Sequence, residues 1–281
     1  MRAKLGRTVV TIVVLSTMLV GTRVSGASAA ANPFPEQLVA GFETYGFGAV
    51  FVYANGTVEP HGDAGFVGDA SSISLAAPIT GGANGPNGCT CQGYVLVATD
   101  GGVFTFGQAH FWGSMGGRHL NQPMVAMAAT LLERGYWLAA SDGGVFRFGD
   151  APFLGSLANK HLNQPIVGIA ATASFRPTPN GYRMVARDGG IFDFGDAHFY
   201  GSLAARGFRD VIGMAPTPNG GGYWIVRSSG SVYNFGNALK LGGVVASAFN
   251  PVVAMIVNPY GQGYVLVRRD GTYTAFGAAP F

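Results

Sequence analysis

One segment of this chain, Gly135 to Ser156 with the sequence GYWLAASDGGVFRFGDAPFLGS, recurs along most of its length. The Gly-Tyr pair that opens each copy recurs in steps of 42, 46, 41 and 41 residues, with its tyrosine at Tyr94, Tyr136, Tyr182, Tyr223 and Tyr264. The Phe-Gly pairs of the second half keep the same steps, at Phe106, Phe148, Phe194, Phe235 and Phe276. A period in the low forties that is built from short strands is typical of β-propeller blades.

A sixth, degenerate copy precedes these five. The sequence from Gly48 to Asp69, GAVFVYANGTVEPHGDAGFVGD, aligns with the repeat without a gap. Its Asn55-Gly56 pair stands at the position of Asp142-Gly143 in the best copy. The sequence therefore predicts six repeats.

Each repeat predicts four strands. The first, as in Val125–Ala129, is small and apolar and suits a crowded place next to the propeller axis. The second, Tyr136–Ala140, is apolar at nearly every position, which is typical of a strand covered on both faces. An Asp-Gly turn leads into an alternating third strand, Val145–Phe148. A short fourth strand is expected at Pro152–Ser156.

The first 29 residues have the three parts of a secretory signal peptide. Arg2, Lys4 and Arg7 form the basic start, residues 8–20 form the apolar run, and Ala27-Ser28-Ala29 is a small-residue cleavage site. An apolar run of about 13 residues is too short to span a bilayer. We therefore expect a secreted or cell-wall-associated protein whose mature chain has no transmembrane segment.

Charge and composition narrow the function classes. The signal segment holds four of the 17 basic residues and no acid, so the mature chain has 13 basic and 14 acidic groups. With a net charge of −1 and no basic stripe, nucleic-acid binding is not expected. The 45 glycines and 48% hydrophobic residues are typical of a turn-rich extracellular β protein and argue against disorder.

The repeats predict one domain, residues 32–281, with an all-β fold: a six-bladed β-propeller of roughly 42-residue, four-stranded repeats. The expected blades are residues 37–69, 73–114, 124–156, 166–202, 211–243 and 252–281. Each blade lies within one repeat, so closure of the ring depends on packing between the end blades unless their strands are shared. Two blades carry insertions between their first and second strands, from Gly81 to Gln92 and from Ser174 to Asn180. Neither the repeat nor the composition specifies an oligomeric state.

The motif GYWLAASDGGVFRFGDAPFLGS, with LNQPIVGIAAT before the next copy, resembles the glycine-rich repeat of secreted actinobacterial proteins. The resemblance is strong from Met124 to Phe281 and weak from Leu38 to Asp69. It implies propeller modules, which in longer chains sometimes accompany cell-wall hydrolases, and it transfers no catalytic motif to this chain. The fifth copy departs from the pattern, with Ser229-Gly230-Ser231 in place of Asp-Gly-Gly.

One predicted face of the ring collects both insertions and the turns after the third strands, where loops on a rigid scaffold commonly bind ligands. The ligand-binding candidates on this face are Gln108, His110, Asp150, Asp196 and His198, and Trp112 is a further candidate outside it. The alternative is that Gly-Asp-Ala is simply the turn that each blade needs, with the aspartate accepting backbone hydrogen bonds. Most aromatic residues recur at fixed strand positions and are expected to pack between blades. Trp112, on an outer strand, is the one expected to be exposed.

No catalytic or metal-binding signature emerges from the sequence. Glycoside hydrolysis needs two carboxylates about 5 to 10 Å apart, and nothing in the pattern brings Asp150 and Asp196 together. Neither a Gly-x-Ser-x-Gly elbow nor a His-Glu-x-x-His helix is present. The repeated hairpin aspartates supply one carboxylate per blade, fewer oxygens than calcium requires. We expect no metal and no cofactor.

The only cysteines, Cys89 and Cys91, lie in the first insertion. Export favours their oxidation, and a disulfide between residues i and i+2 is sterically possible but strained. An intermolecular bridge is the alternative, while a metal site lacks further ligands. A disulfide within the loop closes so little chain that we expect little global stabilisation from it.

The sequence therefore predicts a secreted or envelope-associated binding or scaffold module, non-enzymatic, that binds a protein or a cell-wall glycan through the two insertions. The competing hypothesis is an extracellular hydrolase that acts on envelope carbohydrate or ester from the same face. A third is a purely structural partner of another exported protein.

Overall fold

The computed structural model describes residues 34–44, 48–84, 93–130, 134–172 and 181–279. The predicted signal peptide, Cys89, Cys91 and most of both insertions lie outside these ranges. Residues 31–281 form one compact unit. Across the described ranges, no helix is both long enough and apolar enough to cross a membrane.

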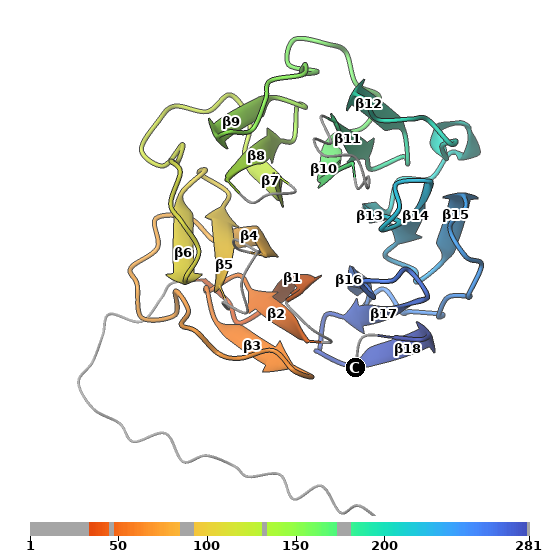
Figure 1. Cartoon of the computed structure of the whole chain (residues 1–281), viewed down its shortest axis with the longest axis horizontal. Helices are drawn as coiled ribbons and strands as arrows, with labels where there is room; N and C mark the ends of the chain where they lie inside the picture. Colours follow the sequence, from red (N-terminus) through yellow and green to blue (C-terminus); the bar gives the residue numbers. More distant parts are fainter. Residues whose placement is uncertain (1–33, 45–47, 85–92, 131–133, 173–180, 280–281) are drawn as a thin grey trace, which may run out of the picture. The chain divides into compact units, whose positions relative to one another are not determined.

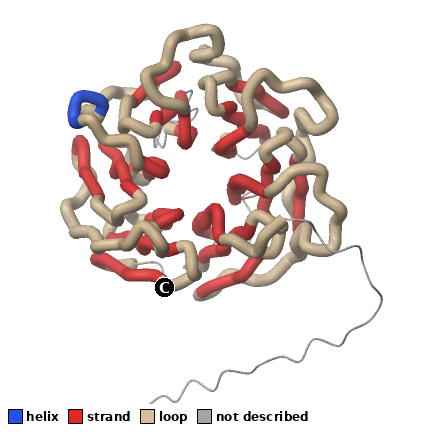
Figure 2. The backbone as a smooth tube through the Cα atoms, turned by 180° about the vertical axis from the view of Figure 1, so that it is seen from behind, coloured by secondary structure: helices blue, strands red, loops and turns tan. Residues whose placement is uncertain are grey.

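The described chain contains 18 strands in six antiparallel sheets and one short 3-10 helix, Ala204–Arg206 (Figure 1, Figure 2). Each sheet holds three strands that are consecutive in the chain. The strands are β1 (Leu38–Glu43), β2 (Ala49–Tyr53) and β3 (Val58–His61) in sheet 1; β4 (Ile79–Asn84), β5 (Gly93–Ala98) and β6 (Val103–Gly107) in sheet 2; β7 (Met124–Ala129), β8 (Gly135–Ala140) and β9 (Val145–Gly149) in sheet 3; β10 (Ile166–Ala171), β11 (Gly181–Ala186) and β12 (Ile191–Gly195) in sheet 4; β13 (Val211–Pro216), β14 (Gly222–Arg227) and β15 (Val232–Gly236) in sheet 5; and β16 (Val252–Val257), β17 (Gly263–Arg268) and β18 (Tyr273–Gly277) in sheet 6.

The six sheets follow one another around a central opening, with the first strand of each sheet innermost (Figure 1). Each first strand contacts the first strand of the next sheet, and β1 contacts β16, so the ring is complete. The arrangement is all-β and propeller-like. It confirms the six repeats and the place of the small, apolar first strand next to the axis.

The core lies between the sheets. Six clusters of buried apolar side chains are present, and each one joins two neighbouring sheets. The second strands β5, β8 and β11 are buried at every position. The continuous apolar sequences of β5 and β8 predict this burial, whereas β11 buries Arg183, whose Nε pairs with the Asp193 carboxylate at 3.1 Å. Burial of both faces of each sheet explains why a single repeat has no core of its own.

The predicted fourth strand is not formed: each described sheet has three strands. The segment after the third strand, which we name the outer segment, places its carbonyl groups against side chains rather than against a strand. In sheet 3 the carbonyl of Pro152 accepts from Trp137 Nε1 at 2.7 Å, and that of Gly155 accepts from the Tyr182 hydroxyl at 2.5 Å. Gly155 has a φ of 141°, which is incompatible with an extended strand of L-residues.

The first insertion is shorter than predicted. Strand β4 extends through Asn84, so Gly81–Asn84 pair with β5 and belong to the sheet. Gly82 fits close packing, because a Cβ atom there would lie 2.5 Å from the ring of Phe42. Glycine is found here because the strand lies close to the neighbouring sheet. From the sequence alone, such a strand cannot be distinguished from a glycine-rich loop.

A repeated contact, which we name the glycine latch, joins neighbouring sheets. In it the tyrosine of a second strand donates its hydroxyl hydrogen to the carbonyl of a glycine in the preceding sheet's outer segment. The pairs are Tyr94 with Gly68, Tyr136 with Gly113 at 2.5 Å, Tyr182 with Gly155 at 2.5 Å, Tyr223 with Gly201 at 2.6 Å and Tyr264 with Gly242 at 2.5 Å.

A phenylalanine from the third strand closes each latch over the same glycine. A Cβ atom on the five glycines would lie between 2.5 and 3.3 Å from the rings of Phe106, Phe148, Phe194, Phe235 and Phe276. The glycines also have φ angles between 117° and 141°, a region that disfavours any residue with a Cβ atom. Two of the landmarks that define the repeat in the sequence therefore serve the contact between repeats.

The junction between sheet 6 and sheet 1, which we name the seam, lacks this latch. Ala49 stands at the tyrosine position and His61 at the phenylalanine position. The His61 ring lies over Phe51 with centroids 3.8 Å apart, and Tyr273 of sheet 6 approaches Phe51 and His61 at 6.3 and 6.2 Å. The seam is closed by packing between the end sheets, without a shared strand.

Candidate functional site

All six first strands carry a β-bulge, and the bulged residues line the central opening. The register of each pair with its second strand shifts at the second residue of the first strand. A bulge redirects a side chain. Here it yields a ring of β-branched side chains, which we name the collar: Val39, Thr80, Val125, Val167, Ile212 and Val253.

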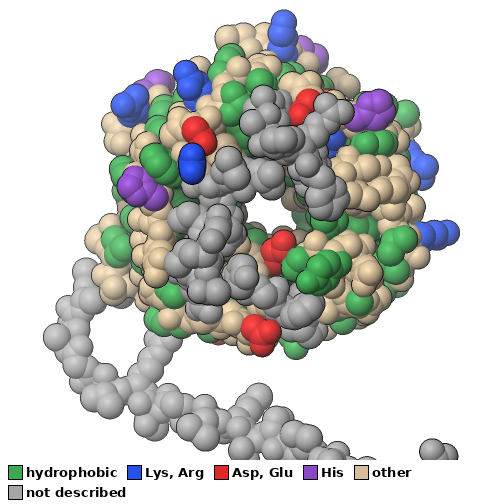
Figure 3. Space-filling model, viewed as in Figure 1, with side chains coloured by type: hydrophobic (Ala, Val, Ile, Leu, Met, Phe, Trp, Pro, Cys, Tyr) green, Lys and Arg blue, Asp and Glu red, His purple; other side chains and the backbone are tan. Residues whose placement is uncertain are grey.

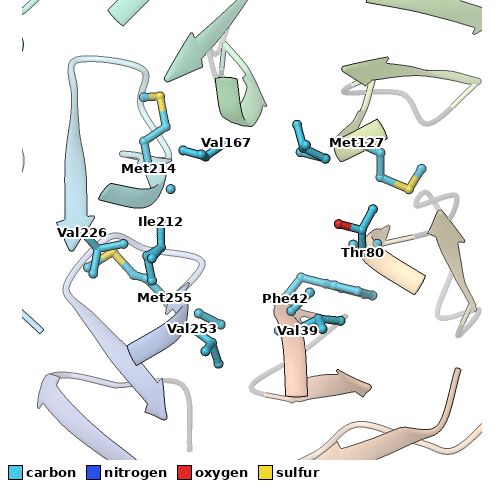
Figure 4. Close-up of a pocket in the computed structure, with 18 residues that line it drawn as sticks. Val39, Phe42, Thr80, Met127, Val167, Ile212, Met214, Val226, Val253 and Met255 are labelled. Carbon is cyan, nitrogen blue, oxygen red and sulfur yellow. The ribbon is translucent and has the colours of Figure 1, made fainter. Parts of the chain in front are cut away.

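On one side of the collar lies a cavity of about 180 Å³ whose side chains are apolar apart from Thr80. Its lining includes Phe42, Met127, Met214 and Met255, with glycine and alanine backbone between them. Figure 4 shows Met214 and Met255 across the opening from Met127. The space-filling view in Figure 3 keeps a hole at the centre of the ring, so the side chains do not fill the channel.

On the other side of the collar lies a larger cavity of about 830 Å³, which we name the wide mouth. Collar residues form its floor, and hairpins between second and third strands, with the links between sheets, form its wall. The polar residues of the wall are Gln37, Gln122, Ser141, Arg187, Arg209, Asp210 and Ser228. This mouth is on the face opposite the turns that the sequence singled out.

Main-chain hydrogen bonds fix the wall of the wide mouth. The amide of Ser141 donates to the Pro123 carbonyl at 3.0 Å, and the Ser141 carbonyl accepts from Ile166 of the next sheet at 2.9 Å. Arg187 repeats the pattern, with its amide on the Pro165 carbonyl at 2.9 Å and its carbonyl accepting from the Val211 amide at 3.1 Å. The wall is therefore a rigid frame that carries variable side chains.

The wide mouth is positively charged on the side of sheets 4 and 5. The carboxylate of Asp210 accepts from Arg227 Nε at 2.7 Å, which neutralises that acid. Arg187 and Arg209 have exposed side chains and form no ion pair with any described residue. Sequence reasoning missed both arginines, because neither repeat position keeps one residue type. The position of Arg187 holds Ala, Thr, Ser or Arg in other copies, and that of Arg209 holds Glu, Ala, Gln or Asn.

The structure gives Asp150 and Asp196 a role in the turns. Asp150 accepts from the Thr130 hydroxyl at 3.1 Å, and Asp196 accepts from the Thr172 hydroxyl at 2.9 Å. Each contact joins the turn after a third strand to the loop after the first strand of the same sheet. In sheet 5, Asn237 accepts from Thr217 in the same way at 3.1 Å. A neutral amide thus replaces the carboxylate, so the position needs an acceptor and not an acid.

The candidates in sheets 2 and 4 form equivalent ring pairs. His110 packs on Trp112 with ring centroids 4.2 Å apart, and His198 packs on Tyr200 at 4.9 Å. Gln108, His110 and His198 are exposed, and Trp112 is 37% exposed, as predicted. These residues belong to separate sheets, and each pair is completed within its own outer segment.

The prediction that the other aromatic residues pack between sheets is right for Trp137 and Trp224, which are buried. It is wrong for one repeat position on the outer segment. Phenylalanines there are more than half exposed in four consecutive sheets: Phe66 (58%), Phe111 (52%), Phe153 (56%) and Phe199 (55%). Their recurrence at one spacing was visible in the sequence, but their direction was not.

Sheet 1 holds a carboxyl and an imidazole with clearly shifted pKa values. Burial raises the pKa of Glu43 to about 7, and burial lowers the pKa of His61 despite the opposing charge of Glu59. Glu43 pairs across the sheet with Ala49, at the seam. Among the residues that the structure describes, no three His, Cys, Asp or Glu side chains gather to hold a metal ion.

Comparison with known proteins supports the fold alone. No family model matches the sequence, and no curated protein matches it. The fold is similar to the crystal structure of a protein of unknown function from Bacteroides thetaiotaomicron, with a TM-score of 0.55 and 13% sequence identity. That match covers 89% of this chain and 74% of the other.

Proposed function

We propose that this chain is an exported, non-enzymatic binding module for a polymer of the cell envelope, a glycan in the first place. The observation that carries the proposal is the exposed phenylalanine that recurs on the outer segments of sheets 1 to 4. In sheet 5 the corresponding residue is Lys240, and in sheet 6 it is Phe281, which lies outside the described residues.

A series of equivalent exposed rings suits a ligand that itself repeats. Aromatic side chains offer large, rigid apolar faces and are enriched where proteins bind partners. The Trp112 and His110 pair enlarges this surface in sheet 2. A glycan chain presents the apolar faces of successive sugars, so several weak contacts along one polymer add up by effective concentration.

The turn geometry supports binding rather than hydrolysis. Asp150 and Asp196 hold loops of their own sheets through threonine hydroxyls, and Asn237 serves equally well in the same place. No specific observation on the described residues favours a hydrolase. The predicted N-terminal signal peptide and the resemblance to secreted actinobacterial repeats support a secreted or wall-associated location.

The test is a pull-down of the exported protein on purified wall glycan and, in parallel, on the secreted proteome of the source organism. A triple variant, Phe111→Ser, Phe153→Ser and Phe199→Ser, is compared with Phe249→Ser, which changes a 95% exposed phenylalanine in the link between sheets 5 and 6. We expect the triple variant to lose glycan retention by about tenfold or more, because aromatic anchors dominate such contacts. The single control variant should bind like the wild type.

Equal retention of the wild type and the triple variant would contradict this role of the exposed rings. Retention of one defined protein instead of glycan would replace the glycan by a protein partner. Release of soluble sugar from the glycan during the incubation would establish a hydrolase.

A further inference from the structure

We propose that the wide mouth is a binding site for a small aliphatic carboxylate, such as a medium-chain fatty acid. Arg187 and Arg209 hold the carboxylate, and the collar holds the aliphatic chain. This site is on the face opposite the turns after the third strands and is independent of the glycan-binding function proposed above.

The charge of the wide mouth selects an anion. Asp210 is the acid in its lining, and Arg227 already neutralises that acid, so Arg187 and Arg209 leave an excess of positive charge. A guanidinium group matches the two oxygens of a carboxylate in geometry and in charge. Two such groups on one wall of a cavity favour a carboxylate over a neutral or cationic ligand.

The two arginines are carried by ordered backbone. Arg187 is held on both sides by main-chain hydrogen bonds to Pro165 and Val211. Arg209 precedes Asp210, whose carbonyl accepts from the Ser228 amide at 2.8 Å. The guanidinium of Arg227, which pairs with Asp210, also lies 3.8 Å from the ring centroid of Phe208. Little backbone ordering remains to be done when a ligand binds, which favours affinity.

The floor of the wide mouth selects an aliphatic group. The collar supplies five branched hydrocarbon side chains and one threonine, and the lining of the mouth contains no aromatic residue. Stacking on sugar rings therefore has no partner in this lining. Apolar surface of this kind binds a hydrocarbon chain through burial.

The collar leads from the wide mouth to the inner apolar cavity. All six collar residues line both cavities, so a chain that passes between them enters the space lined by Met127, Met214 and Met255. Methionine side chains are flexible and polarisable and adapt to a ligand. The site thus has a cationic entrance and an apolar interior in series, which is the order of groups in a fatty acid.

Titration calorimetry of the exported protein with octanoate tests the proposal. Acetate tests the need for the chain, and octylamine tests the need for the negative charge. We expect saturable binding of octanoate, with acetate and octylamine at least about tenfold weaker, since each lacks one of the two interactions. Absence of saturable octanoate binding, or equal binding of octylamine, would overturn the proposal.

Two variants locate the site. The double variant Arg187→Met and Arg209→Met keeps apolar stems of similar length and removes both charges. Its control is Arg269→Met, which changes an exposed arginine at the repeat position of Arg187 in sheet 6, outside the lining of both cavities. We expect the double variant to lose octanoate affinity by about tenfold or more and the control to keep it. An equal loss of octanoate affinity in the double variant and in the control would show that octanoate binds elsewhere, and would contradict the proposed site.

Discussion

The five latched junctions and the seam solve the same packing problem with different chemistry. At a latched junction a tyrosine hydroxyl, a phenylalanine ring and a glycine of positive φ interlock two sheets. At the seam, both aromatic positions of sheet 1 change together, to Ala49 and His61. The comparison teaches that the recurring Tyr and Phe residues, which define the repeat in the sequence, serve the packing between neighbouring sheets. They are replaced at the one junction where that packing differs.

The seam also holds a carboxyl and a histidine whose pKa values are shifted by burial. Glu43 faces Ala49 in the register where sheets 3 and 4 pair Ala129 with Tyr136 and Ala171 with Tyr182. A carboxyl thus occupies the position beside the missing tyrosine. Stability at the latches rests on steric fit and on the tyrosine hydrogen bond, whereas the packing at the seam also depends on the protonation of Glu43 and His61.

The largest effect is expected from a side chain placed inside a latch. Gly155→Ala directs a Cβ atom to 2.5 Å from the Phe194 ring, at a φ of 141°. We expect the free energy of unfolding to fall by about 2–5 kcal/mol, the sum of backbone strain and overpacking. Urea denaturation measures this loss.

The control for that latch variant is Gly117→Ala. Gly117 has a φ of 75° and no atom within 4 Å of a built Cβ, so it tests the backbone term alone. Its expected loss is about 1–2 kcal/mol. Equal losses in the two variants would show that the Phe194 contact contributes nothing.

The next effect concerns Glu43 at the seam. Its pKa rises from 4.5 to about 7 in the folded protein, so the unfolded chain releases this proton at lower pH. Stability from the neutral carboxyl is therefore complete below pH 4.5 and is lost as the pH rises through 7. At pH 8, Glu43→Gln should stabilise the fold by on the order of 3 kcal/mol.

Urea denaturation between pH 4.5 and pH 8 measures this dependence. Glu36→Gln is the control, because it removes an exposed glutamate from the same end sheet. The Glu43 variant should show a flatter pH profile than the wild type, and the Glu36 variant should not. Parallel profiles of the Glu43 variant and the wild type would refute the assignment.

A smaller effect is expected from the latch hydroxyl alone. Tyr182→Phe keeps the buried ring and leaves the Gly155 carbonyl without its donor. The expected loss is about 1–2 kcal/mol, the usual cost of an unsatisfied buried acceptor. Tyr223→Phe should cost the same, and the two losses should add in the double variant if the junctions act independently.

The smallest effect is expected from His61. Burial lowers its pKa below 6.5, so the neutral ring stabilises the seam above pH 6.5, and this contribution is lost as the pH falls through the folded pKa. His61→Phe restores the residue that the other five sheets carry. We compare the double variant Glu43→Gln and His61→Phe with the single variant Glu43→Gln. When the pH is lowered from 7.5 to 5, the melting temperature of the double variant should fall less than that of the single variant.

Exposed His119 provides the matched control for this acid sensitivity. In the same background, His119→Gln should leave the fall in melting temperature unchanged. If His61→Phe and its parent fall equally on acidification, the histidine has no part in the pH response of the seam.

The sequence predicts those features of the fold that depend on residues within a single repeat. The period predicts six units, and the strand segments around Tyr136 and Val145 are where the structure places them. The fourth strand failed because the partner of the Gly155 carbonyl is a tyrosine in the next repeat. The sequence gives no prediction of the bulges, since a one-residue shift of register leaves no mark in an apolar strand.

The candidate sites also differ in whether they depend on one repeat or on several repeats brought together. Exposure of Trp112 followed from its place in one repeat. The wide mouth, by contrast, depends on Arg187 and Arg209, which vary between copies and come together only when the ring closes. The face of the insertions stays a prediction, because most of those residues lie outside the described ranges.

The seam has a mechanical consequence. When a load pulls the two ends of the ring apart, the junction without a latch meets the force first and separates at low tension. The latched sheets then come away one after another from the exposed edges, each as a separate rupture that releases on the order of 140 Å of extended chain. We therefore expect a stretched molecule to lengthen in even steps instead of unfolding at once.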